Sequence, residues 1–235
     1  MQPEELRTRF ASLSTAQLAD ACIRRAVPVR CAPAGTRPVV PGDRIAGRAA
    51  PARHVGSVDV FLEAFEQAGP GDVLVVDNAG RTDEACVGDL VVHEARIAGL
   101  SGVAVWGLHR DTADIREIGL PVFSGGALPT GPLRLDERAE HALERARFGQ
   151  WEIGRQDAVF GDEDGVVFVP VAELDGVLAL AEQIRDTERA QAERIRGGES
   201  LRSQLGFGAY LARRAQDADY SFREHLRTIG GAIEE

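Results

Sequence analysis

Two short, continuously apolar segments dominate the hydrophobic pattern, at residues 73–77 and 102–106. The first segment ends in an acid, Asp77, and the second lies between Gly102 and Gly107. This pattern predicts strands that are covered on both faces of a sheet. A third apolar segment at 121–123 predicts a further strand. Helices are predicted where apolar residues recur every three or four positions, at residues 57–68, 89–98 and 112–118. Strands that alternate with helices in this way predict a parallel or mixed sheet with helices packed on it.

The flanking regions carry weaker patterns. Residues 2–25 are predicted to be helical, and Ser14 followed by Gln17 forms a capping-box pattern. Residues 28–56 are rich in proline, glycine and arginine, so we expect loops and short strands there. Apolar segments at 157–160 and 166–169 flank a turn and predict a β-hairpin. A long helix follows from about 172 to 196, and the tail is expected to be helical. The simplest partition is therefore one domain over 1–198 and a helical extension over 199–235.

Composition limits the class of protein. The chain has 235 residues, of which 44% are hydrophobic, so it can bury a sizeable core. Its net charge of −10 argues against nucleic acid as a partner, because phosphate binding needs a concentrated basic surface. Three cysteines without a metal-binding spacing suggest reduced thiols and a cytoplasmic location. The N-terminus lacks a signal-peptide pattern, and no apolar segment approaches the roughly 20 residues of a membrane span.

Candidate chemistry lies in two glycine-containing loops. Residues 87–90 read Val-Gly-Asp-Leu, and residues 107–111 read Gly-Leu-His-Arg-Asp. One predicted helix and one predicted strand separate the loops, so both can reach one edge of the sheet. Backbone N–H groups at a helix N-terminus bind anions, and Arg110 can hold a carboxylate through two hydrogen bonds. Asp111 offers the oxygen ligands that Mg²⁺ prefers. Together these groups suit an enzyme that acts on a small acid with a divalent metal.

Each candidate also has a plainer interpretation. Asp89 could be an ordinary N-cap, and Arg110 with Asp111 could form a local surface ion pair. His109 and His54 could line the same pocket or could be loop histidines without a chemical role. These alternatives stay open on the sequence alone.

The long helix carries one more candidate acid. Its repeating face begins with apolar residues and ends with Arg185 and Glu188. A helix whose repeating face continues beyond its own core is expected to pack against a neighbouring subunit. Glu188 could equally be a solvated acid of this helix.

The order and spacing of these motifs resemble the 4-hydroxy-4-methyl-2-oxoglutarate aldolase family, which also contains the regulators of ribonuclease E activity (RraA-like proteins). The resemblance covers roughly residues 10–200 and rests on the segments 71–77, 85–89, 99–107, 110–111 and 161–170. It implies an α/β fold of the swivelling-domain type, an α/β/α sandwich with a central mixed sheet and a helical C-terminal extension. It also implies a homotrimer, or a hexamer made of two trimers, with active sites at subunit boundaries.

The resemblance implies class II aldolase chemistry. Arg110 would bind the pyruvyl carboxylate, Asp111 would ligate Mg²⁺ or Mn²⁺, and Asp89 would position a water of the metal shell that shuttles the proton. Backbone amides of the 88–91 loop would help to hold the substrate. His109 departs from the family, which usually has a small or apolar residue there, and it could touch the substrate from this turn. The substrate-binding set is therefore Gly88, Asp89, Leu90, Val91, His109 and Arg110. A carboxylate of the long helix would reach the metal site of the adjacent subunit. Glu188 is the preferred candidate for this role, and Glu182 and Asp186 are alternatives.

The expected function is a divalent-metal-dependent lyase. It would cleave a 4-hydroxy-2-oxo acid to pyruvate and a carbonyl product through a metal-stabilised enolate. Oxaloacetate decarboxylation shares that enolate and could occur in the same site. One alternative is a non-catalytic regulator that binds a ribonuclease or helicase, which Asp111 disfavours because the regulator branch lacks that aspartate. A second alternative is a sugar-acid dehydratase or isomerase with the same metal chemistry.

Overall fold

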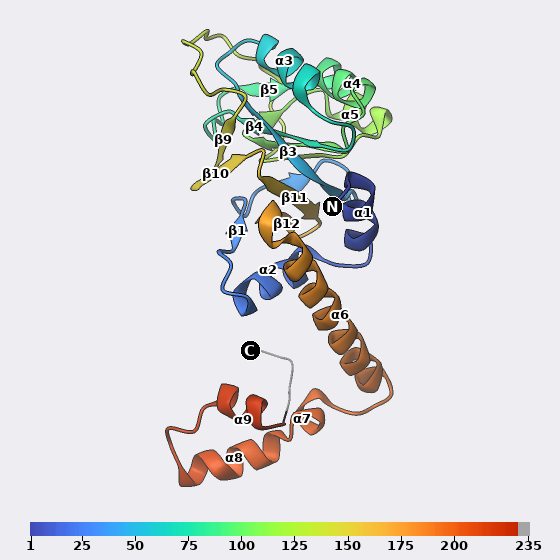
Figure 1. The fold of residues 1–235 in the computed structure, drawn as a ribbon, viewed down its shortest axis with the longest axis vertical. Helices are drawn as coiled ribbons and strands as arrows, with labels where there is room; N and C mark the ends of the chain where they lie inside the picture. The colour runs from blue at the N-terminus through green and yellow to red at the C-terminus, as the bar shows by residue number, and fades with distance from the viewer. Residues whose placement is uncertain (230–235) are drawn as a thin grey trace. The chain divides into compact units, whose positions relative to one another are not determined.

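The computed structural model describes residues 1–229, and the chain divides into two compact units, Met1–Leu178 and Ala179–Glu235. The first unit holds the sheet and the predicted loops (Figure 1). Its helices are α1 (Pro3–Phe10), α2 (Thr15–Arg24), α3 (Asp59–Gln67), α4 (Asp89–Ile97) and α5 (Thr112–Ile118). Its strands are β1 (Arg30–Cys31), β2 (Arg37–Pro38), β3 (Ile45–Arg53), β4 (Val73–Asp77), β5 (Ala85–Val87), β6 (Gly102–Trp106), β7 (Leu108–His109), β8 (Val122–Ser124), β9 (Arg145–Phe148), β10 (Trp151–Gly154), β11 (Asp157–Asp162) and β12 (Gly165–Pro170).

The main sheet has eight strands in the order β1-β12-β11-β3-β4-β6-β8-β2. Strands β3, β4, β6 and β8 are mutually parallel, whereas β11, β12, β1 and β2 pair antiparallel with their neighbours. The mixed α/β fold predicted from the sequence is therefore confirmed. The predicted hairpin is the β11–β12 pair, and the predicted helix at 112–118 is α5.

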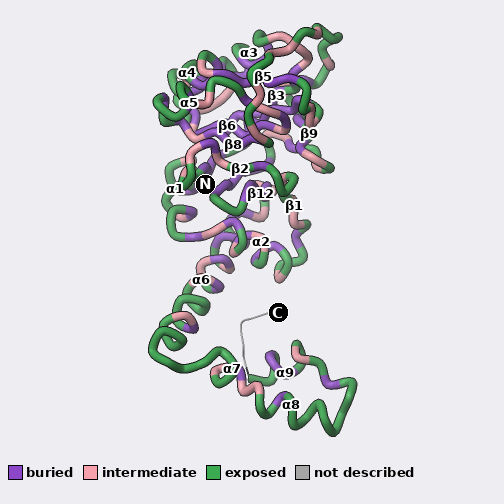
Figure 2. The backbone as a smooth tube through the Cα atoms, turned by 180° about the vertical axis from the view of Figure 1, so that it is seen from behind, coloured by how far each residue is buried: buried purple, intermediate pink, exposed green. Residues whose placement is uncertain are grey.

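Both faces of the central strands are covered, which explains their continuous apolar sequences. In β4, Leu74 and Val76 face the cluster formed with α3, α4 and α5. Val73 and Val75 face the opposite cluster, which includes residues of β9 and β10. Buried positions accordingly concentrate on these strands (Figure 2). The hairpin β9–β10 thus covers the central strands on the side where a second helical layer was expected.

The expectation of loops and short strands over residues 28–56 was wrong for β3. This nine-residue strand lies in the middle of the sheet, parallel to β4. Its residues are mostly alanine, glycine, arginine and proline, which have low strand propensity. Pro51 pairs with Val75 in a central strand, where proline is normally excluded because it cannot donate to the ladder. Tertiary burial overrides the local preference here, since seven of the nine residues are buried.

The second unit begins within α6 (Leu174–Arg196) and continues through α7 (Leu201–Gln204), α8 (Phe207–Gln216) and α9 (Phe222–Ile229). The helical tail is therefore confirmed up to residue 229, and residues 230–235 lie outside the described part. Aromatic rings hold these short helices together, with Tyr210 and Phe222 in an edge-on contact of 5.0 Å. The buried His225 donates from Nε2 to the Leu205 carbonyl at 2.8 Å. The domain boundary at 198, and packing of the tail on another subunit, stay predictions.

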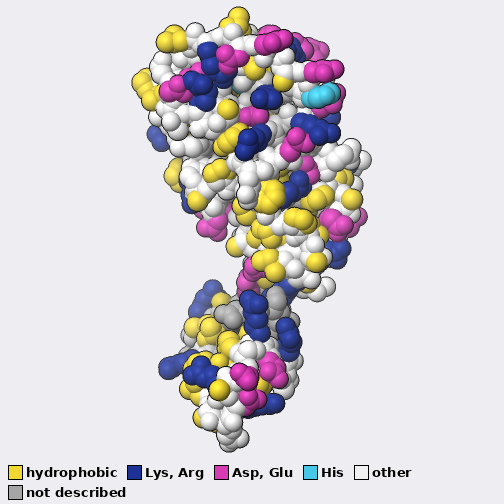
Figure 3. Space-filling view, turned by 90° about the vertical axis from the view of Figure 1, so that its left-hand side faces the viewer, with side chains coloured by type: hydrophobic (Ala, Val, Ile, Leu, Met, Phe, Trp, Pro, Cys, Tyr) yellow, Lys and Arg dark blue, Asp and Glu magenta, His cyan; other side chains and the backbone are white. Residues whose placement is uncertain are grey.

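Basic and acidic side chains are intermixed on the face shown in Figure 3. Among residues 1–229, no helix combines the length and the apolar character that crossing a membrane requires.

Candidate functional site

The two predicted loops lie side by side because they follow a pair of short parallel strands. β5 ends at Val87 and β7 ends at His109, and these two residues are register partners. The Arg110 N–H continues the pairing by donating to the Val87 carbonyl at 2.9 Å. Because carboxyl ends of parallel strands meet at one edge, Gly88 and Arg110 begin their loops next to each other. The loops then lead into α4 and α5, as the sequence predicted.

Gly88 is the N-cap of α4, and Asp89 is its first helical residue, so the interpretation of Asp89 as the N-cap was wrong. The Gly88 backbone is extended, with φ of −127°, and any residue could adopt it. The reason for a glycine at position 88 is steric. A Cβ at this position would lie 2.5 Å from Asp111 Oδ2 and 3.1 Å from Arg110 Nε. Gly88 therefore allows both candidate side chains to lie against the start of the helix.

Asp111 has a left-handed backbone, with φ of 59° and ψ of 42°. Aspartate tolerates this conformation better than most residues. The turn directs its carboxylate to the start of α4, where Oδ2 accepts a hydrogen bond from the Asp89 N–H at 3.4 Å. Asp111 is also the N-cap residue of α5 but makes no side-chain capping bond there. Its charge thus lies at the positive end of the α4 dipole.

Arg110 is half-exposed, and its Nε lies 3.3 Å from Asp111 Oδ2. The plain ion pair considered in the sequence is therefore present, and a solvated pair of this kind stabilises a fold little. The other end of the guanidinium lies against Gly131, where a Cβ would stand 2.7 Å from Nη1. Arg110 consequently spans from Asp111 to the loop that contains Gly131.

His109 lies beneath this site with its ring buried. Its Nδ1 is 2.7 Å from Ser124 Oγ and its Nε2 is 3.0 Å from Thr112 Oγ1. Burial lowers the pKa of this imidazole. The ring thus links β8 to the start of α5 and occupies both of its nitrogens within the protein. The predicted contact between His109 and the substrate therefore stays a prediction.

His54 is also buried. Its Nδ1 is 2.9 Å from Asn78 Oδ1, and its ring stacks on Phe61 at 5.2 Å. Burial lowers its pKa as well. The structure gives this histidine a packing role at the ends of β3 and β4.

The remaining predicted site residues are Leu90, Val91 and Glu188, and they lie in two different helices. Leu90 is exposed and Val91 is buried in the first turn of α4, so the amides of the 88–91 segment lie at the amino end of that helix. Glu188 is exposed on the part of α6 that belongs to the second unit. Its role toward another subunit's metal therefore stays a prediction.

A buried ionic network escaped sequence analysis. Glu84 is 5% exposed at the start of β5, and it accepts hydrogen bonds from Arg134 Nη2 at 2.9 Å and Nε at 3.1 Å. The same guanidinium donates to Asn78 Oδ1 at 3.0 Å. The N–H of Ala85, the residue after Glu84, donates a hydrogen bond to the Thr130 carbonyl. The network thus fixes the loop whose Gly131 backs Arg110.

The side chains at this site meet the needs of a hydrated divalent metal only in part. Within residues 1–229, no three His, Cys, Asp or Glu side chains form a cluster able to hold a metal ion. Mg²⁺ does not require one, because it usually keeps several waters and takes one or two carboxylates. Asp111 is partly exposed on an open loop, so its carboxylate and a shell of water fit this ion.

Residues 15–168 match the RraA-like family, described as Aldolase/RraA. The chain therefore belongs to this family, and the resemblance inferred from its motifs is confirmed.

Individual relatives have modest identity to this chain. A protein of Halalkalibacterium halodurans named "Putative 4-hydroxy-4-methyl-2-oxoglutarate aldolase" is 28% identical over 163 residues, which cover 68% of this chain and 75% of that protein. An uncharacterized protein from Pseudomonas syringae pv. tomato has a similar structure, with a TM-score of 0.72, 27% identity, and coverage of 84% of this chain and 95% of that one. Streptomyces coelicolor RraAS2, named as an unusual member of the RNase ES inhibitor RraA family, has a TM-score of 0.68, 26% identity, and coverage of 79% and 94%.

Proposed function

We propose that this protein is a metal-dependent carbon–carbon lyase that cleaves a 4-hydroxy-2-oxo acid and releases pyruvate. The observation that carries the proposal is the juxtaposition of Gly88, Arg110 and Asp111 at the start of α4. It supplies a carboxylate-binding guanidinium, a metal-binding carboxylate and a helix N-terminus in one place. Relatives named as aldolases support the same reaction class.

Each residue has a separate role in the proposed reaction. Arg110 binds and orients the carboxylate of the 2-oxo acid, since its Nη groups lie beyond the Asp111 contact made by Nε. Amides of the first turn of α4 add hydrogen bonds and a positive dipole toward the same anion. Asp89 lies in that turn and acts through a water that it positions: by this route it takes up the proton of the substrate's 4-hydroxyl group and then returns a proton to the pyruvate carbon.

Asp111 would hold Mg²⁺ or Mn²⁺ with water completing the shell. The bound ion would supply Lewis acidity toward the 2-keto oxygen and so withdraw electrons from the bond that breaks. Oxaloacetate decarboxylation needs the same electron withdrawal, and we propose it as a second activity of the site.

The experiment is a coupled pyruvate assay with a panel of 4-hydroxy-2-oxo acids and oxaloacetate, with Mg²⁺ and with excess chelator. We expect pyruvate release that chelator abolishes and that Mg²⁺ or Mn²⁺ restores. Asp111→Asn should lower both metal affinity and rate, whereas Asp114→Asn, an exposed acid of α5, should change neither. Full turnover in excess chelator would overturn the metal-dependent mechanism.

The proposed assembly is a homotrimer or a hexamer in which Glu188 reaches the metal site of an adjacent subunit. Arg110→Ala and Glu188→Ala chains should each be inactive alone. After verified subunit exchange, the mixture should regain activity, because some sites then hold both native residues. A fully active monomer in sedimentation would contradict the shared site.

A regulatory function is the second candidate, and the likeness to Streptomyces coelicolor RraAS2 favours it. A regulator would slow a ribonuclease of the E type without releasing pyruvate. It would also tolerate Arg110→Ala and Asp111→Asn, provided that its binding surface lies elsewhere. Pyruvate release that both substitutions abolish would decide for the lyase.

A further inference from the structure

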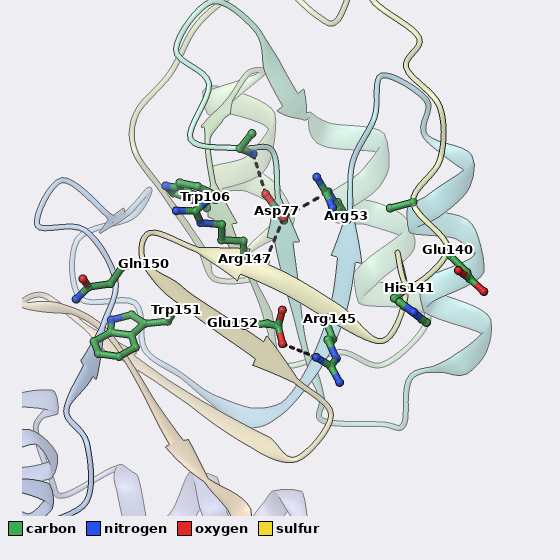
Figure 4. Close-up of a pocket in the computed structure, with 12 residues that line it drawn as sticks. Arg53, Asp77, Trp106, Glu140, His141, Arg145, Arg147, Gln150, Trp151 and Glu152 are labelled. Atoms are coloured by element: carbon green, nitrogen blue, oxygen red, sulfur yellow. Dashed lines mark hydrogen bonds and ion pairs between the residues drawn. The ribbon is translucent and has the colours of Figure 1, made fainter.

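A second pocket lies beyond the carboxyl ends of β3, β4 and β6, the central parallel strands. Its volume is about 640 Å³, and the hairpin β9–β10 forms one wall (Figure 4). Neither the 88–91 segment nor Arg110 and Asp111 line it. Open α/β sheets bind ligands beyond the carboxyl ends of their strands, and small-molecule sites have about 300–1,000 Å³. The pocket therefore has the position and the size of a ligand site.

Asp77 lies at the floor of this pocket, at the end of β4. The residue is buried, and both carboxylate oxygens accept backbone hydrogen bonds, Oδ1 from the Ala79 N–H at 2.8 Å and Oδ2 from the Arg147 N–H at 3.1 Å. Arg53 Nε is 3.8 Å from Oδ2, which is beyond hydrogen-bond distance. Asp77 therefore anchors the hairpin through the backbone and leaves the Arg53 guanidinium, which is half-exposed, able to donate to a ligand.

Arg147 is fixed before any ligand binds. Its guanidinium lies over the Trp106 ring, 5.4 Å from the ring centre, and its Nε donates to the Gly149 carbonyl at 2.9 Å. Among residues 1–229 no carboxylate forms an ion pair with this side chain, so its terminal N–H groups can serve a ligand. A stacked and oriented guanidinium loses little entropy when it binds a carboxylate or phosphate.

The charges of the pocket are unequally distributed. At the rim, Arg145 pairs with Glu152 at 2.7 Å, and these two charges offset each other. At the floor, Arg53 and Arg147 contribute +2 and Asp77 contributes −1, which leaves +1, whereas the exposed Glu140 also lines the pocket and brings the sum over all its charged side chains to zero. Figure 4 shows Asp77 between these two arginines, with the Arg145–Glu152 pair apart from them. The floor therefore favours an anion.

We propose that this pocket binds a small organic anion that carries a flat ring. Its carboxylate or phosphate lies on Arg147 and Arg53, and its ring contacts the Arg147–Trp106 stack and the side of Trp151. Planar rings stack on guanidinium and indole groups with little regard to their identity. The proposal concerns a separate site and does not rest on the lyase reaction.

The chain itself provides a reporter for the test. Trp106 and Trp151 are its two tryptophans, and both line this pocket. Intrinsic tryptophan fluorescence of the full chain therefore reports on this site, and calorimetry gives the dissociation constants independently. The probes are uridine monophosphate and 4-hydroxybenzoate, each with a neutral counterpart, uridine and 4-hydroxybenzamide. The pair that binds distinguishes a phosphate from a carboxylate ligand.

We expect at least one anionic probe to bind about tenfold or more tightly than its neutral counterpart, and to change the fluorescence. Binding of neither anion, or equal binding within both pairs, would overturn the proposal.

Two variants and one matched control locate the anion. Arg147→Gln should weaken binding of the anionic probe by about tenfold or more, and Arg53→Gln should weaken it less. Arg145→Gln removes an equal charge from the same strand and the same pocket, but one already paired with Glu152, so affinity should stay within about twofold. Circular dichroism verifies that each variant is folded. An Arg145→Gln loss as large as that of Arg147→Gln would contradict the assigned site.

Discussion

Gly88 and Asp111 lie so close together that a Cβ on residue 88 would stand 2.5 Å from Asp111 Oδ2. The carboxylate that we propose for the metal therefore depends on the absence of a side chain 23 residues earlier in the sequence. This relationship makes the site sensitive to a single methyl group.

Gly88→Ala should move the Asp111 carboxylate away from α4 and lower kcat/KM by about 10²-fold, because misplacement by about 1 Å costs that much. The extended backbone at position 88 accepts alanine, so the chain should still fold. The measurement is pyruvate release together with a thermal unfolding curve. Gly35→Ala is the control, since a Cβ there meets no atom within 4 Å. Wild-type activity in Gly88→Ala would show that the contact has no catalytic importance.

Arg110→Ala should lower kcat/KM by about 10²-fold or more, through loss of substrate orientation. Lysine should rescue poorly, because it cannot form the two parallel hydrogen bonds of a guanidinium. The rate is measured across the 2-oxo acid panel, and the Mg²⁺ affinity is measured alongside. If lysine restored full activity, Arg110 would be acting as a simple charge.

Asp89→Asn should slow the reaction by about 10²- to 10⁴-fold while substrate and metal still bind, because asparagine cannot accept the proton. The expected signature is a lower kcat with little change in KM. Asn keeps the polar first turn of α4 but removes the charge that interacts with the helix dipole, so the free energy of unfolding should fall by about 1 kcal/mol at most. A normal rate would leave Asp89 only its interaction with the helix dipole.

The sequence predicted the strands and the helices that carry these residues better than it predicted what surrounds them. β4 and β6 have continuous apolar sequences, and Gly88 and Arg110 follow recognisable turns. Only short strands were expected where the nine-residue β3 lies, because burial stabilises residues of low strand propensity there. β5 and β7 have only three and two residues, too few for a periodic pattern. No local signal could reveal Glu84 and Arg134, since they pair across 50 residues.

Glu84→Gln should destabilise the fold markedly, because it leaves the largely buried Arg134 without its bidentate carboxylate. We expect the free energy of unfolding to fall by about 2 kcal/mol or more; the remaining Asn78 and Asp136 contacts limit the loss. Urea unfolding measures the change. Glu152→Gln, which breaks an exposed pair with Arg145, should leave the transition in place. Equal stability of wild type and Glu84→Gln would contradict a structural role of the network.

His54 and His109 should make stability depend on pH. Burial lowers both pKa values in the folded protein, so the unfolded chain binds protons more readily below about pH 6.5. The contribution of these residues to stability is therefore fully present above about pH 6.5 and is lost as the pH falls through their folded pKa values. Urea unfolding at about pH 8 and about pH 5.5 measures this loss. His109→Gln should reduce it, whereas His141→Gln, which removes an exposed ring, should leave it as in the wild type. A His109→Gln variant with the full wild-type pH dependence would show that this buried ring does not contribute to the acid sensitivity of the fold.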